Sequence, residues 1–180
     1  MPVELEVPHG GEAPQMLDEL AGVYVPVYAE PPYNSAPKFS RRRFEDRTRS
    51  QMRAPGFRLV TARDGGRLVG FAFGFTMPAG SWWGNASAPP GEVLQERKFA
   101  VIELILDREH RGRGTGGALL DKLLEGRAER WATLAAVIGA DAYAWYLRRG
   151  WRKVAEFRAE PPYSDALVLD LSNKHPAAGD

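Results

Sequence analysis

The sequence contains no cysteine. Without thiols the chain forms no disulfide, binds no metal through thiolates and has no cysteine nucleophile, and we expect no metal site. An excess of one charge sign is also nearly absent, because 24 Lys and Arg residues are balanced by 23 Asp and Glu residues to a formal net charge of +1. Such a chain exerts no long-range attraction on nucleic acid or on an anionic membrane, so we expect neither as a partner.

A long apolar run is missing as well. The best candidate, "LVGFAFGFTMPAG", is too short for a membrane span and is interrupted by Gly and Pro. The beginning, "MPVELEVPHGGE", has neither the basic start nor the apolar centre of a signal peptide, so we expect a cytoplasmic protein. The arginine-rich "RRRFEDRTR" at 41–49 contains Glu45 and Asp46, and we interpret it as the solvated face of a helix.

A length of 180 residues indicates a single domain, which we place at 1–170, with a flexible tail at 171–180. In the first half we expect a short strand at 3–7 and helices at 14–29 and 40–52, the second capped by Ser40. "DGG" then joins two strands, 57–63 and 67–77, in a hairpin. Large side chains alternate with Gly and Ala in the second of these strands. This predicts a sheet covered on both faces, one of them open to the close approach of a helix or ligand.

The second half alternates between apolar strands and helices. We expect a central strand at 98–107, a helix at 114–130, a strand at 132–138, a helix at 141–150 and closing strands at 151–157 and 163–171. A long Gly- and Pro-rich connection at 78–97 carries "SWWGN". Connections of this length inside a compact domain usually have a function.

The stretch "HRGRGTGGALL" at 110–120 lies between the central strand and a helix. A strand, a glycine turn and a helix together present free backbone N–H groups to an anion, which predicts a phosphate site. A P-loop is excluded, because Ala118 and Leu119 stand where Lys and Ser or Thr are required. The glycines also match the G-x-G-x-x-G fingerprint of dinucleotide-binding proteins, but a hairpin precedes them in place of a βαβ unit.

A third interpretation fits better. "RGRGTG" at 111–116 has the spacing R-x-x-G-x-G, and "AYAWYLRRGW" at 142–151 has a Tyr four residues before a Gly and an aromatic residue. With the order of the predicted elements, these segments resemble the GCN5-related N-acetyltransferase (GNAT) family. The resemblance covers nearly the whole chain and is strongest over 98–151. One departure is Gly139, where many members have an Asn that contacts the cofactor.

The resemblance implies an α/β fold of the GNAT type, with a mixed, mostly antiparallel sheet of six or seven strands and about four helices. It also implies acetyl-CoA as co-substrate. The expected cofactor-binding residues are those of the glycine stretch together with the end of the central strand, whose backbone polarises the thioester: Leu104, Ile105, Leu106, Arg111, Gly112, Arg113, Gly114, Thr115, Gly116 and Gly117.

Two residues are expected to be catalytic. The resemblance makes Tyr146 the acid that protonates the leaving thiolate, and the alternative is a core tyrosine packed between helix and sheet. Glu103 is the candidate base, since it is the only charge in "FAVIELIL" and a charge inside a central strand is costly unless it is used or paired. The alternative is a Glu that is paired with a nearby arginine or lines a polar cleft. His110 is a weaker candidate base, which we expect to be exposed to solvent.

Four residues of two loops are expected to line the acceptor site, namely Tyr33, Asn34, Trp82 and Trp83. Aromatic walls suit a flat or apolar acceptor, or an ammonium group held by a cation–π contact. The two tryptophans have two alternatives, a local hydrophobic plug and the interface of a homodimer.

The sequence therefore predicts an acetyl-CoA-dependent N-acetyltransferase that acts by direct transfer on the primary amine of a small molecule. An acetyltransferase of protein N-termini or lysines, and a non-catalytic acyl-CoA-binding module, are the alternatives.

Overall fold

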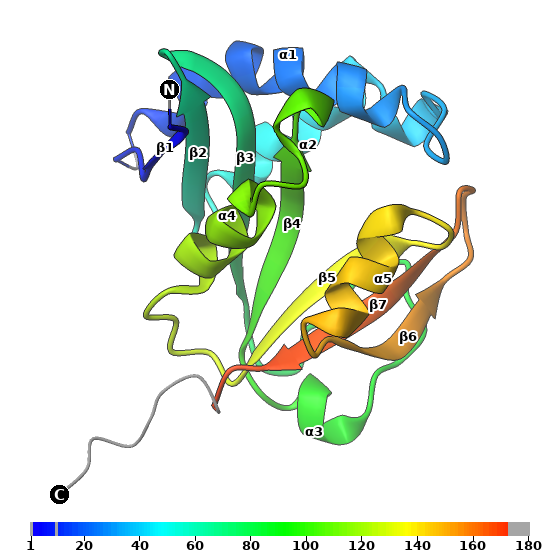
Figure 1. The fold of residues 1–180 in the computed structure, drawn as a ribbon. Helices are drawn as coiled ribbons and strands as arrows, with labels where there is room; N and C mark the ends of the chain where they lie inside the picture. Colours follow the sequence, from blue (N-terminus) through cyan, green and yellow to red (C-terminus); the bar gives the residue numbers. More distant parts are fainter. Residues whose placement is uncertain (1, 10, 173–180) are drawn as a thin grey trace, which may run out of the picture. The chain divides into compact units, whose positions relative to one another are not determined.

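A computed structural model describes residues 2–9 and 11–172. These residues divide into two compact units. Unit 1 comprises the described residues within 1–75 and 101–125, and unit 2 those within 76–100 and 126–180. Within the described ranges, seven strands form one sheet in the order β1-β2-β3-β4-β5-β7-β6 (Figure 1). Within the same ranges, none of the helices has the length and apolar character that a membrane span requires. Residues 173–180 of the predicted tail lie outside the described residues.

Unit 1 is built on the predicted hairpin. β1 (Glu4–Glu6) pairs antiparallel with β2 (Arg58–Asp64), which pairs antiparallel with β3 (Arg67–Met77). The hairpin turn contains Gly65 and Gly66, both at positive φ, as the tight turn between twisted strands requires. The "DGG" prediction is therefore confirmed.

The two helical segments that precede β2 pack together on the hairpin and share one hydrophobic core with it. The first helical segment comprises η1 (Ala13–Met16) and α1 (Leu17–Tyr28), and the second comprises η2 (Pro37–Phe39) and α2 (Arg41–Gln51). The Oγ of Ser40 accepts a hydrogen bond from the N–H of Arg43 at 3.3 Å, so the predicted cap of α2 is confirmed. Large apolar side chains fill the core on this side, among them Leu20, Tyr24, Phe44, Phe71 and Phe73.

On the face of β3 that carries small residues, the neighbouring strand approaches the backbone at Gly70 closely. A Cβ on Gly70 would lie 2.7 Å from the carbonyl oxygen of Ile105 and 2.8 Å from a methyl carbon of Leu106. Both residues belong to β4 (Lys98–Leu106). At Gly70 the missing side chain therefore admits a strand, where we expected a helix or a ligand.

Helix α4 (Thr115–Leu124) packs on β2 and turns Leu119, Leu120, Leu123 and Leu124 inward. The predicted helix at 114–130 is too long. The chain leaves the helix at Glu125, and Gly126 follows at a φ of +69°, a conformation that ends a helix.

Unit 2 contains the strands and helices that follow α4, together with the long connection and the start of β4. Its strands are β5 (Trp131–Val137), β6 (Arg152–Phe157) and β7 (Ser164–Asp170), with β7 antiparallel to both others. The parallel pairing of β4 with β5 covers Lys98–Ala100 and Trp131–Thr133, all in unit 2. Helix α5 (Asp141–Arg148) follows β5, and the long connection contains the one-turn helix α3 (Gly91–Leu94).

Candidate functional site

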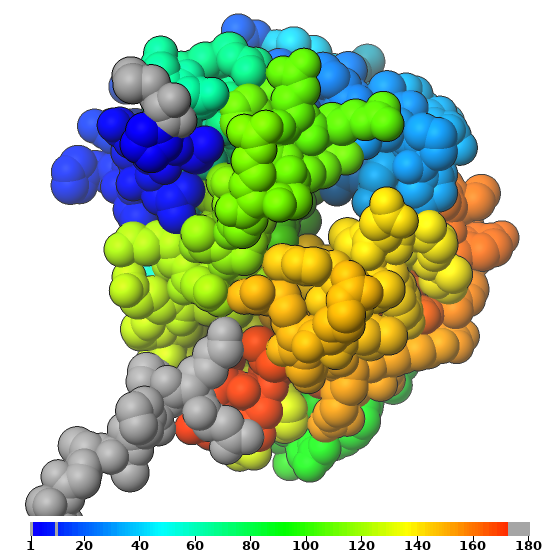
Figure 2. Space-filling model, viewed as in Figure 1, coloured from blue at the N-terminus to red at the C-terminus, as the bar shows by residue number. Residues whose placement is uncertain are grey.

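The glycine stretch of unit 1 forms a turn that opens helix α4. Gly112 and Gly114 have φ values of +73° and +83°, so both need glycine for their backbone conformation. Gly114 is the N-cap residue of α4, and no side chain caps the helix. The first N–H groups of an uncapped helix point outward with the positive end of the helix dipole, an arrangement that suits an anion. Figure 2 shows this part of the chain, in light green, at the surface.

Gly116 tests whether this turn is built for a ligand. It lies in the first turn of α4 without a positive φ, and a Cβ there would meet no atom within 4 Å. The fold itself therefore gives no reason for glycine, which is less favourable than alanine in a helix. Close approach of a ligand backbone or phosphate is the reason that remains, so the turn fits the pyrophosphate of a CoA ester.

The two arginines of the turn differ in their surroundings. Arg111 binds Glu30 with both terminal nitrogens, at 2.7 and 3.1 Å, and its Nε donates to the carbonyl of Leu106 at 2.9 Å. Arg113 is exposed. The guanidinium of Arg111 thus holds the turn against the ends of α1 and β4, and its expected contact with pyrophosphate stays a prediction.

Glu103 lies in β4 and is 5% exposed. The hydroxyl of Tyr28 donates a hydrogen bond to its Oε2 at 2.8 Å, and the Nη2 of Arg47 lies 3.6 Å from its Oε1. Burial raises the pKa of Glu103 to about 7, against the opposing effects of Arg47 and Tyr28. The carboxyl of Glu103 is therefore paired with an arginine, as the alternative interpretation states. It can also exchange a proton near neutral pH, as a general base must.

Aromatic rings surround the partners of Glu103. The ring centroid of Tyr28 lies 4.4 Å from that of Tyr24, 4.8 Å from that of Tyr33 and 4.5 Å from that of Phe39. The predicted acceptor residue Tyr33 thus joins the cluster that holds the candidate base. Asn34 is exposed at a φ of +50°, and its side chain donates to the carbonyl of Pro32 at 3.3 Å.

The candidate acid lies in unit 2. Tyr146 is 8% exposed near the end of α5, and its ring makes edge contacts with Trp145 and Trp151 at centroid distances of 5.1 and 5.8 Å. Tyr146 is therefore packed as the alternative interpretation, a core tyrosine, requires. The catalytic role of Tyr146 rests on its place in the motif and stays a prediction.

The family of this chain follows from a comparison with models of known families. The model described as "Acetyltransferase (GNAT) family" matches residues 16–151. The chain belongs to the GNAT family. The predicted GNAT-type fold, with a mixed, mostly antiparallel sheet, is confirmed. A comparison with curated proteins gave no match.

Solved structures share the GNAT fold over most of the chain at low sequence identity. PH1933 from Pyrococcus horikoshii OT3 has a TM-score of 0.66 at 18% identity, with 94% of this chain and 98% of that chain covered. NAA60 of Arabidopsis thaliana, in complex with a bisubstrate analogue, has a TM-score of 0.65 at 14% identity, with 94% and 98% covered. An aminoglycoside 6′-acetyltransferase of type Ii has a TM-score of 0.61 at 15% identity, with 93% and 97% covered.

In this GNAT protein the two tryptophans of the long connection pack inside unit 2. The indole N–H of Trp83 donates to the hydroxyl of Thr133 on β5 at 3.1 Å, and its ring meets Phe157 of β6 edge-on. The indole N–H of Trp82 donates to the carbonyl of Ser87 at 3.0 Å. These contacts are those of a local hydrophobic plug, and a role of Trp82 and Trp83 in acceptor binding stays a prediction.

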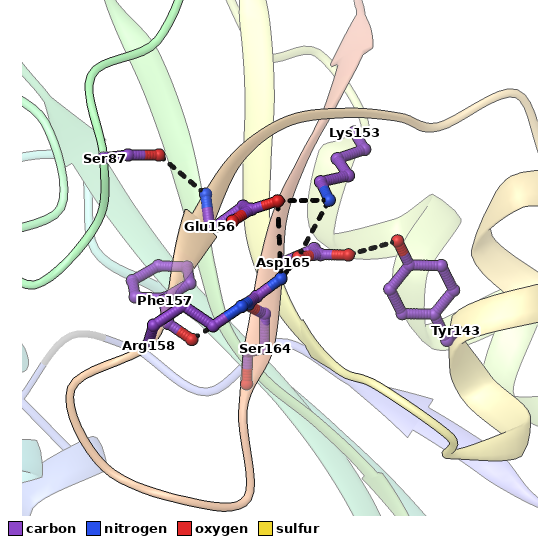
Figure 3. A network of polar contacts seen from close by, with 8 residues as sticks. All are labelled: Ser87, Tyr143, Lys153, Glu156, Phe157, Arg158, Ser164 and Asp165. Carbon is purple, nitrogen blue, oxygen red and sulfur yellow. Dashed lines mark hydrogen bonds and ion pairs between the residues drawn. The ribbon is translucent and has the colours of Figure 1, made fainter.

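The structure of this GNAT protein also contains a polar network that the sequence did not reveal, centred on Asp165 of β7 (Figure 3). The buried carboxylate accepts a hydrogen bond from Tyr143 of α5 at 2.7 Å and one from Arg158 at 2.9 Å, with Lys153 at 3.5 Å. Burial and Asp165 raise the pKa of Tyr143 to about 12, so this phenol stays protonated. The network binds α5 and the β6–β7 connection to β7.

A second buried network joins Thr76, Arg127 and Glu129. The Oε1 of Glu129 lies 2.6 Å from both the hydroxyl of Thr76 and the Nη2 of Arg127. Although burial opposes ionisation, these hydrogen bonds lower the pKa of Glu129 to about 2. Glu129 is thus a buried carboxylate that stays charged, in contrast to Glu103.

The expectation that His110 is exposed is wrong. His110 is 6% exposed, and its Nε2 lies 3.0 Å from an oxygen of Asp64 at the hairpin turn. Among residues 2–9 and 11–172, no cluster of three or more His, Asp or Glu side chains is suited to a metal ion.

Proposed function

We propose that this GNAT protein transfers the acetyl group of acetyl-CoA directly to the primary amine of a small molecule. The observation that carries this proposal is the environment of Glu103. A buried carboxyl whose pKa lies near 7 and whose partners belong to an aromatic cluster suits the deprotonation of an amine at neutral pH. The uncapped turn at 112–117 supports acetyl-CoA as the donor.

The proposed reaction needs one proton acceptor and one proton donor. Glu103 takes a proton from the ammonium form of the acceptor, and the free amine attacks the carbonyl carbon of the thioester. Backbone N–H groups within Leu104–Leu106 stabilise the oxygen of the tetrahedral intermediate. The C–S bond then breaks, and Tyr146 protonates the thiolate. The nitrogen gives its second proton to water, and water restores the proton of Tyr146, so that an amide and CoA result.

A small acceptor agrees with the size of the aromatic cluster. Tyr28, Tyr33 and Phe39 pack against one another at centroid distances of 4.5 to 5.7 Å. Rings at such spacing offer a compact apolar wall beside one carboxyl group, which fits an amine on a small apolar or flat body. The similar structures include an aminoglycoside acetyltransferase, which supports a small-molecule acceptor.

The test mixes the protein with acetyl-CoA and a panel of amines, and follows the release of free thiol. The panel contains small primary amines, peptides with a free N-terminus and peptides with an internal lysine. Thiol release with small amines above the rate with acetyl-CoA alone supports the proposal. Release with peptides alone makes the protein a peptide acetyltransferase. Tight CoA binding without release for any amine makes it a binding module, and both results overturn the proposal.

Replacing Gly116 with Ala should have opposite effects on the stability of the fold and on the affinity for CoA. The variant should be more stable by about 0.5 kcal/mol, because the added methyl favours the helix and meets no atom in the protein. Its Kd for CoA should nevertheless rise about tenfold, because the methyl occupies the space of the pyrophosphate. Thermal unfolding and titration calorimetry measure the two effects.

Gly22 provides the matched control for this variant. It is exposed in the middle of α1, and a Cβ there also meets no atom within 4 Å. Gly22→Ala should stabilise the protein to a similar or larger extent and leave CoA binding unchanged. Equal CoA affinity of Gly116→Ala and the unchanged protein would show that the phosphates do not approach α4.

A further inference from the structure

His110 lies in η3 (Arg108–His110), the single turn of 3₁₀-helix between β4 and the glycine turn. The N–H of His110 donates to the carbonyl of Asp107 at 3.0 Å, and Gly112 follows two residues later. The position of η3 therefore sets where the glycine turn begins. A side chain that fixes η3 acts on the whole anion-binding turn without touching the anion.

The side chain of His110 reaches back to the β2–β3 hairpin. Its ring is 8% exposed, and Nε2 lies 3.0 Å from the Oδ2 of Asp64, the last residue of β2. Asp64 precedes Gly65 and Gly66, whose positive φ values define a tight turn. One end of the contact is thus held by the β2–β3 hairpin and the other by the short turn that leads into the glycines.

The surroundings of the second ring nitrogen, Nδ1, indicate which tautomer His110 adopts. Nδ1 of His110 is buried and has no hydrogen-bond partner within the residues that the structure describes. A proton on Nδ1 would have no acceptor there, which is costly, so the ring carries its proton on Nε2 and donates it to Asp64. The same hydrogen bond lowers the pKa of Asp64. His110 is therefore a buried donor to a carboxylate.

Two further contacts hold the same segment. Arg67 of the hairpin lies 3.1 Å from Asp107, but its side chain is 62% exposed, and an exposed pair contributes little. Arg111 binds Glu30 at the end of α1. The contact between His110 and Asp64 is the most buried of these three side-chain contacts.

We propose that His110 and Asp64 form a positioning pair that holds the glycine turn in the shape that binds the pyrophosphate of acetyl-CoA. The proposal rests on the proposed function, in which this turn binds CoA. Neither residue contacts the acceptor or the reacting atoms in this scheme. Loss of the pair therefore weakens CoA binding, while kcat at saturating acetyl-CoA stays close to that of the unchanged protein.

The test measures the Kd of CoA by titration calorimetry for His110→Leu, Asp64→Ala and the double variant. Each single variant should bind about tenfold more weakly, since a hydrogen bond to a charged group is lost. The double variant should be no weaker than the weaker single variant, because both changes break the same contact. His110→Gln should recover most of the affinity, because its amide nitrogen can donate to Asp64 in place of Nε2.

Glu19→Gln is the matched control. Glu19 forms a bidentate ion pair with Arg63, the neighbour of Asp64 on β2, but this pair connects β2 with α1. The control should keep the CoA affinity of the unchanged protein. If His110→Leu does not fold, Asp64→Ala and His110→Gln carry the test. Unchanged affinity in Asp64→Ala, or equal loss in Glu19→Gln, overturns the pair, whereas failure of the unchanged protein to bind CoA overturns the proposed function.

Discussion

Replacing Glu103 with Gln should lower kcat/KM at neutral pH by roughly 10²- to 10³-fold, the effect expected on loss of a general base. Gln keeps the size of the side chain and an oxygen that accepts the hydrogen bond from Tyr28, so the change removes the basic group with little disturbance. Steady-state kinetics with an amine from the thiol-release test would measure the loss. The affinity for CoA should not change.

The pH dependence of this reaction should identify the same residue. Because the base must be ionised, kcat/KM of the unchanged protein should rise with pH and level off above about 7, the pKa of Glu103. In Glu103→Gln the remaining slow reaction should lack this rise. A rise with the same midpoint in the variant would assign the ionisation to another group.

The contribution of Glu103 to the free energy of unfolding should fall as the pH rises, whereas kcat/KM should increase. Burial raises the pKa of Glu103 from 4.5 to about 7, so the folded chain holds this proton more tightly than the unfolded chain. The stabilisation by Glu103 is therefore complete below pH 4.5 and is lost as the pH rises to about 7. Relative to the unchanged protein, Glu103→Gln should gain up to about 3 kcal/mol over this range, as denaturant unfolding at pH 5 and pH 8 would measure.

Glu129→Gln is the control for both measurements. Glu129 is also a buried carboxylate, but hydrogen bonds lower its pKa from 4.5 to about 2. Its stabilisation is present above pH 4.5 and is lost as the pH falls toward 2. The variant should therefore be less stable at neutral pH and keep the rise of kcat/KM near pH 7. At neutral pH, Glu103→Gln should therefore stabilise the protein and Glu129→Gln should destabilise it. This opposite effect distinguishes a general base from a structural carboxylate.

Replacing Tyr146 with Phe should lower kcat by about 10²-fold, the second large effect, because the thiolate then leaves without a proton from the protein. The affinity for CoA should stay the same. The phenyl ring keeps the edge contacts with Trp145 and Trp151, so the midpoint of thermal unfolding should change little. Kinetics at saturating acetyl-CoA and a thermal unfolding curve measure the two quantities.

Tyr143, on the same helix, gives the matched control. Its hydroxyl donates to the buried carboxylate of Asp165, so Tyr143→Phe should destabilise the protein by about 1 to 2 kcal/mol and leave kcat unchanged. A Tyr146→Phe variant with the kcat of the unchanged protein would make Tyr146 the core tyrosine of the alternative interpretation.

Local patterns in the sequence predicted most of the fold because they depend on neighbouring residues. The hairpin followed from "DGG", and the start of α2 followed from Ser40. The end of α4 was misplaced because apolar spacing continues to Ala128, although the backbone turns at Gly126. Gly126 indicates the end of the helix in the sequence, but the helical spacing of apolar residues beyond it predicts a longer helix.

The surroundings of the candidate site were less accessible to such patterns. Glu103 was found because a charge in an apolar strand is unusual, but its partner Tyr28 is 75 residues away along the chain. His110 and Asp64 are 46 residues apart, so nothing near His110 indicated that it is buried. Contacts of this kind arise from packing between elements, which spacing within one segment does not encode.

The division into two units has a spectroscopic consequence. All five tryptophans, at positions 82, 83, 131, 145 and 151, belong to unit 2, and unit 1 has none. Fluorescence excited selectively in tryptophan therefore follows unit 2 alone, whereas far-ultraviolet circular dichroism follows the helices and strands of both. If the two signals change at different denaturant concentrations, the units unfold separately, and the order of the transitions shows which of the two is less stable.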